Sequence, residues 1–434
     1  MLNGIFVALV VGAVGIAAFA GKLGDVNDAA LASAKGSVEI LLGLVGVMAM
    51  WLGFMRVLRE AGWLGALARA LTPVLRRLFP EIPADHPAMS AIVLNLAANV
   101  LGLGNAATPF GLVAMRELES LNPRPGVATN SMALFLAINT AGLAVLPLGA
   151  IALRASLGST NAAGIVVPSL CASFCATAVG IVAAKLLERW RWFAAERAQP
   201  GESLGEPPRS GDFASLELAQ RAAALHPARA PGRTLLGVAF ALLLGFAAAR
   251  SFAAAPSFAT AKSMLSSWLL PALMAAIALA GFARRVAVYD AFIAGAREGL
   301  EIAVTILPYL LAILVAVGVF RASGGLDTLT QAVAPLTSWV GFPAEALPMA
   351  LIRPLSGSGA LAVMTEIMQH YGPDSFPGFL ACVINGSSET TFYVIALYLG
   401  SVGVRASRHT VFACLAADFA GVAAALVASR AFYS

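Results

Sequence analysis

Long runs without charged residues are the feature that most limits what this chain can fold into. A helix needs roughly 20 apolar residues to cross a hydrocarbon layer about 30 Å thick. Only 12% of the 434 residues are charged, where a soluble domain carries about 25%, and the mean hydropathy is +0.83. Apolar and polar residues do not alternate with period two within these runs, as they would in the strands of a β-barrel. We therefore expect an all-α polytopic membrane protein with about nine spanning helices. The runs lie near 2–20, 38–56, 128–153, 162–187, 233–250, 265–283, 300–320, 377–399 and 408–430.

A polar segment divides the chain into two blocks. Residues 198–232 gather prolines, glycines and charged residues between two apolar regions, as expected of an exposed linker. The first apolar run lacks a basic leader and a small-residue cleavage site, so we expect it to be retained. The sequence therefore predicts two units, 1–197 and 233–434, joined by the linker.

The two units resemble each other. SAKGSVEILLGLVGVM from Ser33 aligns with GAREGLEIAVTILPYL from Gly295, and farther along AMREL from Ala114 aligns with VMTEI from Val363. Self-similarity of this length indicates an internal duplication.

The copies differ in the charges that decide orientation. Residues 55–79 hold five arginines and one glutamate, whereas their counterpart, 318–342, holds one arginine and one aspartate. By the positive-inside rule the first segment faces the cytoplasm and the second faces outward. This predicts a multi-pass protein of the cytoplasmic (inner) membrane, with a cytoplasmic N-terminus and linker, and inverted repeats typical of secondary transporters. The basic residues that oppose this arrangement are Arg154, Arg250, Lys262 and Arg321.

Each repeat contains a polar, glycine-rich interruption within an apolar stretch. The first is LNLAANVLGLGNAATPFG from Leu94, and the second is ALPMALIRPLSGSGA from Ala346. Backbone that leaves helical geometry at membrane depth is tolerated only where it is buried in protein or lines a water-filled cavity. We therefore predict two broken re-entrant hairpins that meet at a central ligand site. Its candidate residues are Asn95, Asn99, Asn105, Thr108, Arg353, Ser356 and Ser358.

A second polar cluster follows each interruption, in FLAINT and in NGSSETT. An ionisable group at membrane depth is costly unless paired or hydrated, which makes Glu389 and Arg353 the strongest functional candidates. The alternatives are a buried structural ion pair for these two residues and helix packing for the amides and hydroxyls. The ligand-site candidates from this cluster are Asn139, Thr140, Asn385, Ser387, Ser388, Glu389 and Thr390.

Other classes of function find little support in the sequence. Metalloprotease and hydrolase motifs are missing, and no strand precedes GLGNAATPFG as a dinucleotide fingerprint would require. The basic residues flank apolar runs and do not form an aromatic-interleaved patch, so we expect no nucleic-acid partner. The interruptions offer mainly amides and hydroxyls, which are poor ligands for ferrous iron. We expect no enzymatic activity, no cofactor and no bound metal.

The same stretches resemble a known family. LNLAANVLGLGNAATPFGLVAMREL with FLAINT looks like spore maturation protein A, and ALIRPLSGSGALAVMTEIM with NGSSETTFYV looks like spore maturation protein B. Both belong to the nucleoside-recognition, or Gate, family, which is related to parts of concentrative nucleoside transporters and ferrous iron transporters. The resemblance covers nearly the whole chain apart from the linker, and it implies a nucleoside-like or dipicolinate-like solute. The binding positions that it implies are Asn95, Asn99, Asn105, Arg353, Ser356, Ser358 and Glu389.

These features together predict a permease for a small polar or anionic organic solute, working by alternating access around two inverted Gate repeats. Its partners are the solute and membrane lipid. The sequence leaves open whether Na⁺ or H⁺ supplies coupling and whether the chain forms a homo-oligomer. The alternative is a non-transporting membrane protein that binds a ligand or regulates envelope assembly or spore maturation.

The opposite orientation of the repeats can be tested by labelling. In a background without native cysteines, single cysteines at Ala66 and at Thr330 should react with a membrane-impermeant thiol reagent from opposite sides of the membrane, because their segments carry contrasting charge. Reaction of both from the same side would contradict inverted topology.

Overall fold

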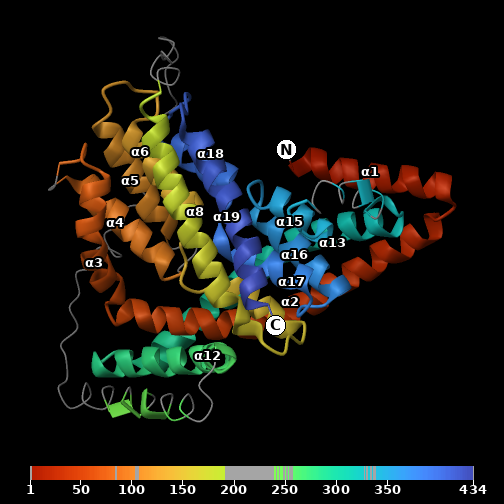
Figure 1. The fold of residues 1–434 in the computed structure, drawn as a ribbon, viewed down its shortest axis with the longest axis horizontal. Helices are drawn as coiled ribbons and strands as arrows, with labels where there is room; N and C mark the ends of the chain where they lie inside the picture. Colours follow the sequence, from red (N-terminus) through yellow and green to blue (C-terminus); the bar gives the residue numbers. More distant parts are fainter. Residues whose placement is uncertain are drawn as a thin grey trace.

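The described part of the chain is helical (Figure 1). One isolated bridge joins Val127 and Ala406. The computed structural model describes residues 2–83, 86–102, 107–190, 258–326 and 339–433, with short pieces of 239–253 and 328–335. The predicted linker 198–232, most of the run 233–250, and the residues Asn105 and Thr330 lie outside the described residues. The described segments that are long and apolar enough to cross a membrane are Leu23–Glu60, Ala162–Leu187, Phe376–Ser401 and Thr410–Phe432.

The two halves have similar series of helices. The first half contains α1 Leu2–Ala20, α2 Leu23–Glu60, α3 Trp63–Leu78, α4 Pro87–Val100, α5 Thr108–Ser120, α6 Asn130–Thr140, α7 Leu148–Ser156 and α8 Val166–Leu187. The second half contains α12 Phe258–Ala283, α13 Val288–Ala322, α15 Leu347–Ile352, α16 Gly357–Tyr371, α17 Phe376–Ser387, α18 Thr391–Ser401 and α19 Thr410–Phe432.

The long helices α2 and α13 pack against each other through small residues. Gly299 faces the backbone of Ala49, where a Cβ would approach to 2.7 Å, and Gly318 lies against Ser33. The later residue of α13, Gly318, contacts the earlier residue of α2, Ser33, so the two helices run antiparallel. They contain the stretches that align in sequence, so this packing is the arrangement that inverted repeats require.

Helices α8 and α19 form a second antiparallel pair, side by side in Figure 1. Their sequences are also similar: SFCATAVGIVAAK from Ser173 aligns with DFAGVAAALVASR from Asp418. Small residues let these helices approach closely, at Gly180 on Ala417 and at Gly421 on Ala176.

Two of the predicted spans, 128–153 and 377–399, contain a break in the helix, although the second lies within Phe376–Ser401, which is long and apolar enough to cross a membrane. Helix α6 ends before a segment at 141–147, where Gly142 adopts a left-handed φ of +57° and Pro147 lacks an N–H for a continuing helix. Helix α17 ends at Ser387, and the next residue, Ser388, is extended with φ −152° and ψ 165°. The other two stretches also contain helix breaks, as predicted: α4 ends at Val100 and α5 begins at Thr108, while α15 ends at Ile352 and α16 begins at Gly357.

The broken helices interlock the two repeats. One apolar core surrounds α4, α5 and α6 but also takes Ile395, Tyr398 and Leu399 from α18. The other surrounds α16 and α17 but also takes Ile151 and Leu153 from α7. Each repeat therefore passes its chain into the core of the other repeat at a helix break.

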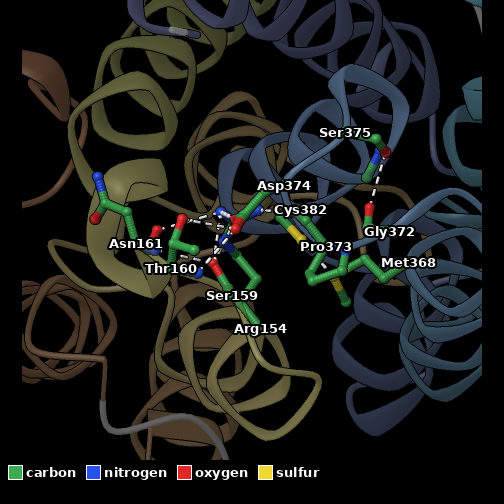
Figure 2. A network of polar contacts seen from close by, with 11 residues as sticks. Arg154, Ser159, Thr160, Asn161, Met368, Gly372, Pro373, Asp374, Ser375 and Cys382 are labelled. Atoms are coloured by element: carbon green, nitrogen blue, oxygen red, sulfur yellow. Dashed lines mark hydrogen bonds and ion pairs between the residues drawn. The ribbon is translucent and has the colours of Figure 1, made fainter.

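A polar network ties the end of α7 to the loop between α16 and α17 (Figure 2). The Arg154 side chain, only 2% exposed, lies 2.8 Å from Asp374 Oδ1 and also donates to the carbonyl of Pro373. Asp374 in turn accepts hydrogen bonds from the hydroxyls of Ser159 (2.6 Å) and Thr160 (2.8 Å). This network gives Arg154, which opposes the predicted charge distribution, an acidic partner.

We predict that Asp374→Asn destabilises the folded protein by about 3 kcal/mol, because it leaves the buried charge of Arg154 uncompensated. That cost is at the low end of the range for buried pairs, since the Asp374 side chain is 38% exposed. The melting temperature in detergent measures it. The same substitution at exposed Asp290 should have little effect, and an equal loss in both variants would contradict the prediction.

The same network predicts a dependence of stability on pH. Burial would raise the pKa of Asp374, but hydrogen bonds from Ser159 and Thr160 and the charge of Arg154 hold the pKa below its ordinary value of 3.8. A lowered pKa stabilises the fold above the pKa of the unfolded chain, and this contribution is lost as pH falls through the folded value. Acid should therefore lower the melting temperature of the wild type more than that of Asp374→Asn.

Candidate functional site

The helix breaks of both repeats meet in one place. Together with the residues that flank them we call it the crossing: the described residues 99–102, 107–108, 139–147, 353–358 and 385–392. Backbone hydrogen bonds join the breaks, from Val145 N to Val100 O (3.0 Å), from Phe392 N to Pro354 O (3.0 Å) and from Glu389 N to Thr140 O (2.8 Å). The first two bonds lie within a repeat, and the third links the repeats. Each break thus offers hydrogen-bond partners to backbone N–H or C=O groups of another break, where the helix has ended and leaves those groups unpaired.

Gly142 allows the two repeats to touch at backbone level. A Cβ at this position would lie 2.9 Å from Glu389 N and 2.9 Å from the carbonyl carbon of Ser388. The left-handed φ of Gly142 adds strain for any other residue. A side chain here would therefore separate the α6–α7 break from the α17–α18 break.

Arg353 is the buried cation of the crossing. Arg353 is 7% exposed, and its guanidinium donates a hydrogen bond to the carbonyl of Ser388. Its Nη2 lies 3.6 Å from Glu389 Oε2, but the Glu389 side chain is 54% exposed. Glu389 lies in the break between α17 and α18, within the apolar segment Phe376–Ser401, and its side chain is not buried in the protein. The pair is not a fully buried structural ion pair.

The asparagines connect α4, α5 and α6. Asn95 is fully buried and donates to the carbonyl of Ala107 (2.8 Å), which holds the α4–α5 break closed. Asn99 donates to Asn139 (2.8 Å), and Asn139 donates to the carbonyl of Phe135 in its own helix (3.0 Å). The structure therefore brings these predicted residues together, with Asn99 half-buried and the other two buried.

Several hydroxyl groups that were predicted to line the ligand site form hydrogen bonds within their own helices. Thr140 donates to Ala137 O (3.2 Å), and Ser387 donates to Ile384 O (3.0 Å). Ser356 caps α16 by accepting from the N–H of Gly359 (3.0 Å), as expected of a serine that precedes a helix. Ser388 and Thr390 are also buried. The predicted residues that keep accessible surface at the crossing are Asn99, Thr108, Ser358, Asn385 and Glu389.

Asp418 is a buried ionisable residue that was not predicted from the sequence. It lies in α19, is 6% exposed, and accepts a hydrogen bond from the Thr391 hydroxyl at 2.7 Å. Its charge also interacts electrostatically with that of Arg353. The signal was a lone carboxylate in the apolar run FACLAADFAGVAAAL, which by the rule applied to Glu389 marks a candidate residue.

Comparison with known proteins agrees with this architecture. The Gate family, described as nucleoside recognition, matches residues 41–157 and 303–405, which contain the breaks of the crossing. Spore maturation protein B of Bacillus subtilis (strain 168) is 45% identical over 163 residues, which cover 38% of this chain and 92% of that protein. Spore maturation protein A of the same strain is 39% identical over 193 residues, which cover 44% of this chain and 96% of that protein. The chain therefore belongs to the Gate family and is a helical membrane protein related to both spore maturation proteins.

Proposed function

We propose that the protein is a permease of the cytoplasmic membrane that moves a small polar or anionic organic solute through the crossing. The observation that carries this proposal is the meeting of helix breaks from two antiparallel repeats around one buried arginine, Arg353. Secondary transporters built from inverted repeats place their solute sites where helices break near the membrane midplane. The N-terminus and the linker face the cytoplasm in this proposal, because their flanking segments are basic.

The surroundings of Arg353 support the proposal that the solute carries an anionic group. Its Nε is buried and has no hydrogen-bond partner among the described residues. The distance of 3.6 Å to Glu389 is longer than that of a charge-assisted hydrogen bond. A planar guanidinium favours carboxylate or phosphate oxygens, which it can bind through two parallel N–H groups. A solute carboxylate could therefore replace Glu389 beside Arg353.

The accessible amides and hydroxyls support a solute with further polar groups. Asn99, Ser358 and Asn385 are half-buried at the crossing, and their side chains can both donate and accept hydrogen bonds. Such groups suit the ring or sugar edges of a nucleoside-like molecule, in keeping with the family description of nucleoside recognition. A dipicolinate-like acid would instead rely mainly on Arg353.

Alternating access follows from the paired architecture. The repeats touch at the bond between Glu389 N and Thr140 O, and their long helices pack antiparallel through glycines. Movement of the two apolar cores, each built from both repeats, against each other would open the crossing to each side in turn.

A non-transporting, ligand-binding or regulatory protein is the second candidate. The observation that favours it is the use of Asn95, Thr140, Ser356 and Ser387 in hydrogen bonds that hold helices and breaks together. Polar groups used in this way stabilise membrane helices without binding a solute.

Uptake separates the two candidates. Sealed proteoliposomes containing the full chain should accumulate or exchange at least one solute from a panel of nucleosides, dipicolinate and related small acids, under an imposed sodium or proton gradient. Protein-free liposomes and Arg353→Gln proteoliposomes serve as controls. Binding of a panel member without movement across the membrane would favour the non-transporting candidate.

We further predict that accessible and buried polar residues respond differently to substitution. Ser358→Ala and Asn385→Ala should weaken solute binding or uptake while the melting temperature stays near wild type. Asn95→Ala should instead lower stability by about 0.6 to 1.7 kcal/mol, because it removes a buried hydrogen bond to Ala107. Calorimetry of solute binding and thermal melting measure the two effects. Equal losses of stability in all three variants, with unchanged affinity, would contradict a ligand site.

A further inference from the structure

Asp418 is a buried carboxylate that the fold leaves only partly satisfied. Its Oδ2 accepts from the Thr391 hydroxyl at 2.7 Å. Its Oδ1 is buried and has no hydrogen-bond partner in the part of the chain that the structure describes. An ionised carboxylate in this position exposes a charged oxygen to an apolar interior, which is costly. A proton on the carboxyl group removes that charge.

The surroundings of Asp418 leave few other groups to share its charge. Along α19, Gly421 packs on Ala176 of α8 and lies near Ser387 of α17. Within the described residues, the charged and titratable groups that interact electrostatically with Asp418 are Arg353 and Cys414, the latter on the same helix. Arg353 is the cation of this set and therefore the countercharge of Asp418.

The fold does not require a carboxylate at this position. In the alignment of α8 with α19, Asp418 corresponds to Ser173 in the first repeat. Ser173 is fully buried, and its hydroxyl bonds to Leu170 O within its own helix at 3.1 Å. A small hydroxyl side chain therefore suffices for packing at the equivalent place, and the acid in the second repeat needs a separate explanation.

Arg353 connects Asp418 to the accessible part of the crossing. It lies 3.6 Å from the half-exposed Glu389, and its charge also interacts with that of Asp418. With Asp418 protonated, the formal charges of the three side chains sum to zero. With Asp418 ionised, the sum is −1, which opposes the binding of an anion. A proton on Asp418 therefore favours an anionic solute beside Arg353.

From this geometry we infer that Asp418 is a proton-binding site, taking up a proton from water on one side of the membrane and releasing it on the other as the solute moves. The coupling to solute rests on the proposed function, whereas proton binding by Asp418 does not. No covalent bond changes except the O–H bond at the carboxyl group.

Infrared spectroscopy of the purified full chain in lipid nanodiscs tests proton binding without any solute. The wild type should show a carbonyl band of a protonated carboxylic acid that disappears as the pH rises and that shifts after ¹³C-aspartate labelling. The band should be lost in Asp418→Asn. It should persist in Asp290→Asn, which makes the same chemical change at an exposed residue, and in Glu389→Gln. Absence of such a band, or its persistence in Asp418→Asn, would overturn the inference.

A second variant keeps the test valid if Asp418→Asn does not fold. Thr391→Val keeps the carboxylate but removes its hydrogen-bond donor, so the pH midpoint of the labelled band should shift from the wild-type value. An unchanged midpoint in a folded Thr391→Val protein would show that the titrating aspartate lies elsewhere.

Transport measurements test the coupling step. With any panel solute that the wild type moves, Asp418→Asn should abolish accumulation driven by a pH gradient, and solute-driven proton entry, while exchange of solute for solute continues. Accumulation that follows a sodium gradient and is independent of pH would overturn proton coupling. If the wild type moves no solute, the proposed function fails, and the infrared result still decides whether Asp418 binds a proton.

Discussion

The structure depends on one constraint: backbone N–H and C=O groups that leave a helix inside a membrane need partners. Here the helix breaks supply partners for one another. Val100 accepts from Val145, Pro354 accepts from Phe392, and Thr140 accepts from Glu389 in the other repeat. Because each break completes another, no break could be straightened or removed alone without leaving polar backbone groups unpaired. This mutual dependence keeps irregular backbone at the centre of an otherwise helical protein.

The same dependence explains the small residues around the crossing. Gly142 lets the backbones of the two repeats come within contact distance, and glycines along α2, α13, α8 and α19 bring equivalent helices together. Apolar surface gives little net attraction between helices in lipid, so close packing and specific hydrogen bonds must hold the repeats together. The Arg154–Asp374 network adds a polar tie between the repeats away from the crossing.

The sequence predicted the parts of this arrangement that leave a local signal. Glycine, proline and polar residues cluster in the stretches from Leu94 and Ala346, and helices break in both. The break at 141–147 was not predicted, since LAVL at 143–146 is ordinary apolar sequence and only Gly142 and Pro147 indicate an interruption. Pairings such as Arg154 with Asp374 could not be predicted, because they depend on how the repeats interlock. Asp418 could have been predicted as a lone carboxylate in an apolar run, but it lies outside the polar clusters in the sequence.

The two repeats share a scaffold but divide the polar chemistry between them. Among the described residues of the crossing, the first repeat contributes neutral amides such as Asn99 and Asn139, whereas the second contributes Arg353 and Glu389, with Asp418 behind them. A duplicated fold with strictly equal halves would place two like charges near one another close to the axis that relates them, which is unfavourable at low dielectric constant. Restricting the charged groups to one repeat avoids that repulsion. The repeats therefore contribute unequally to the charge of the crossing, and in the permease that we propose this asymmetry lets a single proton change the charge that a solute meets.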